Sequence, residues 1–200
     1  MIDSLLTLDQ RLLLLVNGCH APWADTFFWY VSEKWIWIPL YLLLAALLWQ
    51  RFGWRQMLVM LVGFALAVGL SDYLTSGILK PFIARWRPTR DPQICHWIHI
   101  VNDYRGGKYG FPSSHASDTM ACALLFSLLW RNWKATLPMM LWVALNCYSR
   151  MYLGVHYPLD ILAGLLIGSL MAWLSYRCLA AAFARTGDDD GGATSPPGRS

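Results

Sequence analysis

Charged residues are scarce in this chain of 200 residues. Asp, Glu, Lys and Arg make up 14% of it, whereas a soluble domain carries about 25%. Hydrophobic residues make up 56%, and there are twelve tryptophans, many of them at the ends of apolar runs. Tryptophan is enriched at membrane–water interfaces. The composition therefore argues against a soluble protein and favours one that lies in a membrane.

Several other features are missing. The five cysteines form no CxxC pair and no His-rich pattern, so the sequence predicts neither a metal site nor a cofactor. Cys19 and Cys95 are both expected on the outer face, but the sequence leaves their pairing open. The first residues lack the basic start of a cleaved signal peptide. Basic residues concentrate between Lys80 and Lys108 among motif residues, which does not favour nucleic-acid binding.

Five apolar runs predict an all-α, polytopic membrane helical bundle of five to six helices. The runs cover residues 35–50, 56–79, 116–130, 135–150 and 158–178. Their uncharged stretches reach only about 15 residues, short of the roughly 20 that a span needs. The assignment therefore places Asp72 and Asp118 inside spans, where charged side chains usually face a polar interior or a partner. The alternative for each is a solvated carboxylate near the end of a span.

The segment at residues 5–16 is apolar but contains Asp9 and Arg11. At ~1.5 Å per residue it is too short to cross a bilayer. We expect an interfacial or re-entrant helix, and the alternative is a sixth, poorly formed span. We expect one domain over residues 1–186 and a disordered tail at 187–200, which is rich in Gly, Pro and Asp.

Basic residues between the runs predict the orientation. Because successive spans cross the membrane in opposite directions, these basic residues all fall on one side of it. The positive-inside rule makes that side cytoplasmic. The basic residues are Arg51, Arg55, Arg131, Lys134, Arg177 and Arg185. The loops at 80–115 and 150–157 then lie on the outer face, and every motif described below falls at that face.

The first motif runs from Lys80 to Pro88. Lys80 and Arg87 are seven residues apart, which on a helix predicts a shared face and a separation of ~10 Å. Pro81 would begin this helical segment and Pro88 would end it. Two cations on one face suit a phosphate or pyrophosphate. The alternative is a basic stretch that only touches lipid head groups.

The second motif is Phe-Pro-Ser-Ser-His at residues 111–115. Ser113 and Ser114 are expected to cap the third span, and their N–H groups would then bind an anion at the positive end of the helix. His115 would lie beside that anion, where it could protonate a leaving alkoxide. An ordinary capped helix start with an interfacial histidine is the alternative.

The third motif contains Ser149, Arg150, His156 and Asp160. We expect the Asp160 carboxylate to accept a hydrogen bond from one ring nitrogen of His156, so that the other nitrogen is free to attack phosphorus. Arg150 would complete the phosphate clamp with its bidentate guanidinium. The alternative is an ordinary His–Asp pair at a helix start.

Together the three motifs resemble those of the type 2 phosphatidic acid phosphatase (PAP2) family, which is related to the vanadium haloperoxidases. The family pattern is Lys, six residues, Arg-Pro; then Pro-Ser-Gly-His; then Ser-Arg, five residues, His, three residues, Asp. This chain matches the pattern except at Ser114, where the family usually has Gly. Since the N–H of Ser114 is retained, we expect activity to survive.

The resemblance implies a metal-independent phosphatase with a helical-bundle fold and no cofactor. It implies His156 as nucleophile, Asp160 as the residue that orients it, and His115 as general acid. The implied phosphate-binding residues are Lys80, Arg87, Ser113, Ser114 and Arg150. Water would then hydrolyse a phosphohistidine intermediate, with His115 acting as base.

A site at the membrane surface favours a lipid phosphate as substrate, and the resemblance implies that the reaction takes place at the outer face of a bacterial inner membrane. The cations expected at its mouth are Lys80, Arg85, Arg87, Arg90, Arg105 and Lys108. This charge is compatible with a pyrophosphate or a sugar phosphate. We favour undecaprenyl pyrophosphate, with phosphatidylglycerol phosphate, phosphatidate and lipid A as alternatives. Two other classes stay open: a lipid-phosphate binding or transport protein without turnover, and haloperoxidase-like chemistry. The sequence predicts no particular oligomeric state.

Overall fold

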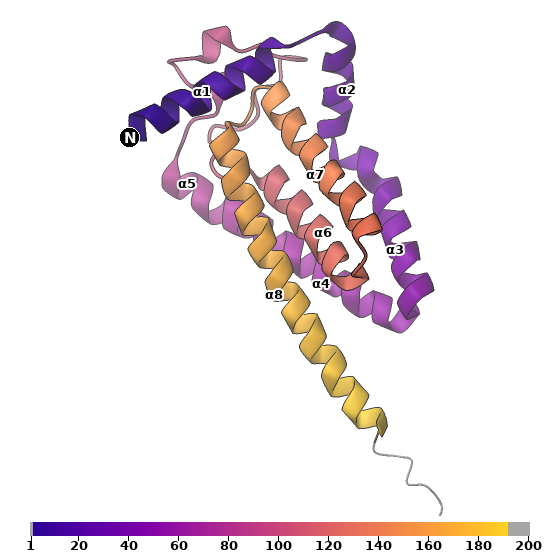
Figure 1. Ribbon diagram of the computed structural model, residues 1–200. Helices are drawn as coiled ribbons and strands as arrows, with labels where there is room; N and C mark the ends of the chain where they lie inside the picture. The colour runs from indigo at the N-terminus through magenta and orange to yellow at the C-terminus, as the bar shows by residue number, and fades with distance from the viewer. Residues whose placement is uncertain (1, 192–200) are drawn as a thin grey trace, which may run out of the picture.

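The computed structural model describes residues 2–191, which form a bundle of helices (Figure 1). The helices are α1 (Ile2–Gly18), α2 (Pro22–Ser32), α3 (Ile38–Phe52), α4 (Trp54–Asp72), α5 (Lys80–Ile83), α6 (Ser114–Trp130), α7 (Trp133–Tyr152) and α8 (Pro158–Gly191). A π-helix at Tyr73–Leu79 joins α4 to α5, and 3₁₀ turns lie at Lys34–Trp37, Pro88–Arg90 and Cys95–Trp97. Over these residues there is no strand, only one isolated bridge between Trp86 and Tyr109. The all-α prediction is confirmed.

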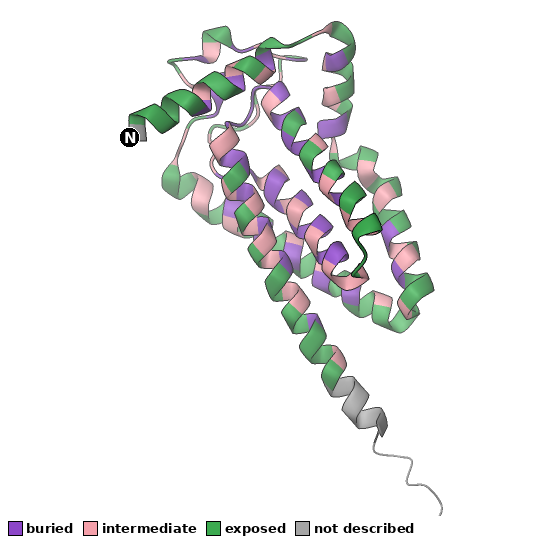
Figure 2. Ribbon diagram, in the orientation of Figure 1, coloured by how far each residue is buried: buried purple, intermediate pink, exposed green. Residues whose placement is uncertain are grey.

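Helix α6 lies at the centre of the bundle, where it packs against α4, α7 and α8 (Figure 1). It is the helix with the most continuous buried surface (Figure 2). Its closest neighbour is α8, because Gly164 and Gly168 place bare backbone against it. A Cβ at Gly164 would overlap the carbonyl oxygen of Ser113, and one at Gly168 would overlap that of Ser117. Glycines four residues apart allow this kind of close helix contact in membranes.

Within residues 2–191, three helical segments are long and apolar enough to cross a membrane: Lys34–Phe52, Trp54–Ile83 and Pro158–Ala184. Helices α6 and α7, which the sequence also predicts to span, run beside them (Figure 1). Large apolar side chains are exposed along the outer surface of the bundle, as in Leu42, Val62 and Leu166. Such a surface is stable in a bilayer and unfavourable in water. The polytopic membrane bundle is therefore confirmed.

Helix α1 lies across the end of the bundle that carries the long loops (Figure 1). Asp9, Leu13 and Asn17, spaced four residues apart, are buried against the protein, while Leu8 and Leu15 are exposed. Two polar side chains thus face inward and apolar ones face outward. This pattern fits the interfacial helix that we expected, and α1 is not among the segments apolar enough to span.

Three further outcomes concern the chain outside the spans. Helix α2, which packs against α7, was not predicted from the sequence. Helix α8 continues to Gly191, past Gly187 where the disordered tail was expected to begin; residues 192–200 lie outside the described residues, so the domain limits stay a prediction. Cys19 and Cys95 are both free thiols.

Candidate active site

The motif residues meet at the end of the bundle that α1 covers (Figure 1). Lys80 begins α5, His115 lies in the first turn of α6, Arg150 in the last turn of α7 and Asp160 in the first turn of α8. His156 lies in the short loop before α8. Each helix supplies its residue from a terminus, so residues far apart in sequence reach one place.

His156 is completely buried between a cation and a carboxylate. Its Nε2 lies 3.3 Å from Nη1 of Arg87, and its Nδ1 lies 3.5 Å from Oδ2 of Asp160. The latter distance is long for the hydrogen bond that the sequence predicts, and Nδ1 has no hydrogen-bond partner among the described residues. Catalytic hydrogen bonds are often long in a free enzyme and shorten when substrate binds.

The neighbours of His156 indicate its tautomer. A guanidinium only donates hydrogen bonds, so Nε2 next to Arg87 must be the acceptor and carry the lone pair. The proton of a neutral ring then lies on Nδ1, on the side of Asp160. This places the free lone pair of the ring beside the Arg87 guanidinium.

Asp160 is held from two sides. Its Oδ2 accepts a hydrogen bond from the N–H of Tyr157 over 3.0 Å, and its Oδ1 accepts one from Nη1 of Arg85 over 2.8 Å. The other arm of Arg85 donates to Asp9 of α1 over 2.6 Å. Asp9 in turn accepts from the N–H of Leu159 over 2.8 Å. Arg85, expected at the mouth, is therefore an internal brace between two buried carboxylates.

Lys80 and Arg87 do not share a helical face, so that prediction was wrong. Helix α5 ends at Ile83, and Ala84 adopts a left-handed conformation with φ of 53°. Arg87 is extended, with φ of −72° and ψ of 151°, because a residue before proline disfavours the helical region. Lys80 instead donates to Ser114 Oγ over 2.8 Å and to Ser76 Oγ over 3.2 Å.

Ser113 is the N-cap of α6, as predicted, and its Oγ accepts a hydrogen bond from the N–H of Ala116 over 3.4 Å. Its own N–H donates to the carbonyl of Asp160 over 2.8 Å, and its side chain is buried. That N–H is therefore engaged within the protein, contrary to the expected contact with an anion. The bond ties the start of α6 to the start of α8.

Arg150 is buried and reaches toward the N-terminal helices. Nη1 donates to Ser32 Oγ at the end of α2, and Nη2 donates to the Tyr104 hydroxyl over 3.2 Å. Its Nε is buried and finds no hydrogen-bond partner in the part of the chain that the structure describes. A buried donor without a partner is a position where a bound oxyanion would be stabilised.

Positive charge dominates the electrostatics. Burial first, and then the charges of Arg87, Arg150 and Lys80, hold the pKa of His156 well below its usual value. Burial, with Arg150 second, lowers the pKa of Arg87 to about 10. Cations that repel one another in a dry site attract an anion strongly. The same surroundings keep His156 neutral at pH 7, the state in which an imidazole nitrogen is able to act as a nucleophile.

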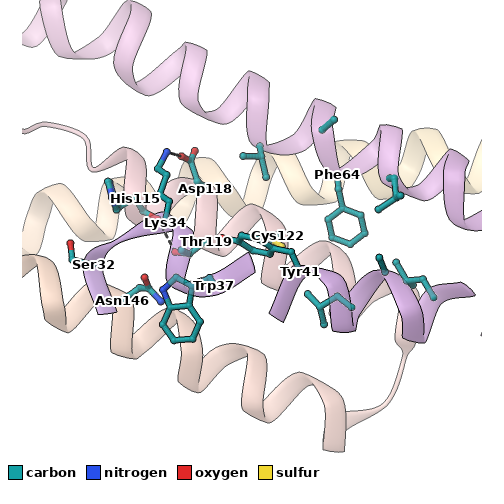
Figure 3. A pocket seen from close by; sticks show the side chains of 16 residues that line it. Ser32, Lys34, Trp37, Tyr41, Phe64, His115, Asp118, Thr119, Cys122 and Asn146 are labelled. Atoms are coloured by element: carbon teal, nitrogen blue, oxygen red, sulfur yellow. Dashed lines mark hydrogen bonds and ion pairs between the residues drawn. The ribbon is translucent and has the colours of Figure 1, made fainter. Parts of the chain in front are cut away.

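Two cavities meet at His115. One cavity, of about 410 Å³, is lined by His115, Arg150 and Tyr104, among others. An apolar one of about 350 Å³ extends from it between α3, α4, α6 and α7 (Figure 3). Ser32, Lys34 and His115 line both. The site is thus amphiphilic, with a charged chamber that opens into an apolar one.

The remaining cations predicted for the mouth lie elsewhere. Arg90, Arg105 and Lys108 line a different cavity, together with Trp86 and Cys95. Arg90 donates to the carbonyl of Gly106, and Lys108 lies 5.0 Å from the centroid of the Trp86 ring. Among the described residues, no group of three His, Cys, Asp or Glu side chains is placed to bind a metal ion.

The family model of the PAP2 superfamily matches residues 56–184. The chain belongs to the PAP2 superfamily. The match includes all three motifs, and the predicted family and class of enzyme, a phosphatase, are confirmed. Helices α1 to α3 precede the match, so Asp9, Ser32 and Lys34 contact this PAP2 site from outside the part that the family model describes.

Similar proteins include a lipid A 4'-phosphatase of Bacteroides thetaiotaomicron, 37% identical over 177 residues, which cover 88% of this chain and 79% of that one. A protein of Escherichia coli named as a candidate undecaprenyl-diphosphatase is 34% identical, over 82% of this chain and 78% of that one. A solved structure, the PAP2-type phosphatidylglycerolphosphate phosphatase of Bacillus subtilis, superposes with a TM-score of 0.64. The match has 21% identity and covers 86% and 84% of the two chains.

Proposed function

We propose that this PAP2 protein hydrolyses the phosphate of a membrane lipid through a phosphohistidine on His156. The observation that carries the proposal is the position of the buried His156 ring, with Nε2 toward Arg87 and Nδ1 toward Asp160. Nε2 attacks phosphorus, the bond to the leaving oxygen breaks, and His115 donates a proton to that oxygen. Water then attacks the phosphohistidine, with His115 accepting its proton.

Charge at the site supports the remaining roles. Arg87, Arg150 and Lys80 stabilise the phosphoryl oxygens as negative charge develops in the transition state. The first turn of α6, which includes Ser114, adds its positive dipole, while Ser113 caps that helix. Asp160 stabilises the imidazolium character of the phosphorylated ring. No step requires a metal ion.

Among lipid phosphates, we favour the phosphate of lipid A as substrate. The relative named for that activity is 37% identical over 88% of this chain. Undecaprenyl diphosphate is the second candidate, supported by the relative at 34% identity. Of the six cations expected at the mouth of the site, Arg90, Arg105 and Lys108 line a separate cavity and not that of His115. We further propose that the site faces outward from a bacterial inner membrane.

The test is phosphate release by the purified chain in detergent, with EDTA, from lipid A, undecaprenyl diphosphate, phosphatidylglycerol phosphate and phosphatidate. The expected result is release that persists with EDTA and is lost in His156→Ala. Acid-labile phosphate on His156 in a rapid quench would identify the intermediate. Lipid binding without release by wild type would instead support a binding or transport protein, and loss of release with EDTA would contradict metal independence.

A further inference from the structure

Asp118 has a buried oxygen that the mechanism does not use. The side chain is 12% exposed, and Oδ2 forms an ion pair with Lys34 Nζ over 3.6 Å (Figure 3). Oδ1 is buried and has no hydrogen-bond partner among the residues that the structure describes. A buried acceptor without a partner is costly, and such a group in a native protein calls for an explanation.

The position of Asp118 relates it to the reaction. It follows His115 by three residues on α6, so the two side chains lie on one face of the helix, about one turn apart. Both line the apolar cavity (Figure 3). A lipid whose phosphate reaches His115 and whose chain enters this cavity therefore passes Asp118 near the junction of the two.

The rest of the cavity suits hydrocarbon. Beyond Asp118 its walls are apolar side chains of α3 and α4, which include Leu44, Leu48, Phe64 and Val68. Ligand cavities of this size, lined mostly by apolar groups, orient their ligands through a few polar groups. Asp118, ion-paired to the largely exposed Lys34, is the charged acceptor at the polar end.

We propose that Asp118 determines substrate specificity: its Oδ1 accepts a hydrogen bond from an N–H or O–H in the segment that links the lipid chain to the phosphate. The proposal rests on the proposed function and narrows its substrates to amide-linked or hydroxyl-bearing lipid phosphates. Polyprenyl diphosphates and phosphatidate have no such donor in that segment. They would leave Oδ1 unpaired next to the bound chain.

The expected discrimination is large because a site built around a hydrogen bond rejects a ligand that lacks the donor. A hydrogen bond to a charged acceptor corresponds to about tenfold to a hundredfold in kcat/KM. A neutral acceptor at the same position is expected to discriminate less, since charge-assisted hydrogen bonds are roughly twice as strong.

The experiment compares ceramide 1-phosphate with phosphatidate of matched chain lengths, using the full chain in detergent. Both are phosphate monoesters with two chains, but only the first has an amide N–H and a hydroxyl in the linking segment. We expect wild type to favour ceramide 1-phosphate by about tenfold or more in kcat/KM. Asp118→Leu should bring the ratio near one, mainly by slowing the ceramide lipid.

Asp118→Asn is the second variant, and it preserves side-chain size if the leucine variant fails to fold. We expect its ratio of kcat/KM for the two lipids to be several-fold below that of wild type and above that of Asp118→Leu. Asp72→Asn is the matched control, because Asp72 is an exposed carboxylate of neighbouring α4 that does not line the cavity. Its ratio should equal that of wild type.

Equal kcat/KM for the two lipids in wild type, or an unchanged ratio in Asp118→Leu, would overturn the inference. If the proposed function is wrong, the result is different: wild type releases phosphate from neither lipid, and neither does His156→Ala. In that case the ratio of the two dissociation constants, measured on His156→Ala with and without Asp118→Leu, tests the role of Asp118 by itself. A ratio that does not depend on residue 118 would refute it.

Discussion

The half-buried Arg85 and the fully buried Asp160 form an ion pair that joins the loop after α5 to the first turn of α8. Nη1 donates to Oδ1 of Asp160 over 2.8 Å, while Nη2 donates to Asp9 of α1 over 2.6 Å. Burial alone would lower the pKa of Arg85, but the two carboxylates raise it. Helix α1 is therefore connected, through one guanidinium, to the carboxylate beside His156, the proposed nucleophile.

Arg85→Lys should lower kcat by about tenfold or more with little change in KM, because an ammonium cannot bind both carboxylates in a fixed fork. Arg85→Met should also destabilise the fold by about 3–5 kcal/mol, since removal of one partner leaves buried charge unpaired. Steady-state kinetics and thermal unfolding in detergent measure both effects. Arg90→Lys, at an exposed position of the 3₁₀ turn Pro88–Arg90, serves as control. A normal kcat in Arg85→Lys would refute the proposed role of Arg85.

Asp160→Asn should leave the protein folded and slow turnover by about a hundredfold or more. The corresponding carboxylate of a hydrolase triad contributes up to ~10⁴-fold, because it maintains the tautomer of the histidine. His156→Ala should abolish turnover altogether. Single-turnover phosphate release, with unfolding curves for each variant, makes the comparison. An unchanged rate in Asp160→Asn would remove that residue from the mechanism.

The acid limb of the pH profile should report His156. Its pKa is held well below 6.5, first by burial and then by cations that include Arg87, so the neutral nucleophile persists well below pH 6.5. Arg87→Gln removes positive charge and should move the acid limb of kcat/KM to higher pH. Wild type and Arg87→Gln are measured on the same substrate, so ionisation of the substrate phosphate affects both pH profiles equally. A limb that stays in place would show that Arg87 does not act on His156.

The same depressed pKa has a consequence for stability. The unfolded chain binds a proton on this histidine near pH 6.5, while the folded chain does so only at lower pH. The folded state therefore loses stability as pH falls from about 6.5 toward the folded-state pKa of His156. The free energies of unfolding of wild type and His156→Gln, plotted against pH across this range, should converge at acidic pH. Parallel curves would contradict the assignment.

Gly164→Ala should damage both stability and turnover. A Cβ there would overlap the carbonyl oxygen of Ser113, and α6 and α8 would have to separate where they hold His115 and Asp160. Overpacking of this kind costs about 1–3 kcal/mol. Gly69→Ala is the matched control, since no atom lies within 4 Å of a Cβ at that helical position. If both variants behave like wild type, close approach of α6 and α8 is unnecessary.

Ser114→Gly, which restores the residue usual in the family, should be tolerated. Lys80 would lose its hydrogen bond to Ser114 Oγ but keep the one to Ser76 Oγ over 3.2 Å. The backbone N–H at position 114 is unchanged. We expect kcat/KM to remain within a few-fold of wild type, since a single hydrogen bond contributes about 1 kcal/mol. A loss beyond a hundredfold would show that the Ser114 hydroxyl is itself required.

Much of the architecture followed from local sequence. The apolar runs predicted the bundle because a bilayer requires long stretches without charge, and Ser113 was recognisable as a helix cap because its hydroxyl replaces a missing backbone acceptor. Alternation of the runs placed Lys80, His115, Arg150 and His156 at one end of the bundle. Each of these features depends on residues close together in the chain.

Tertiary structure decided what depends on distant contacts. The left-handed turn at Ala84 separates Lys80 from Arg87, although their spacing fits a helix. The sequence predicts Arg85 as one more cation at the mouth, whereas in the structure it binds Asp9 and Asp160. Lys34 reaches Asp118 across more than eighty residues of sequence. Periodicity describes which face of a helix a side chain occupies, but only the packing of the helices determines which charges meet.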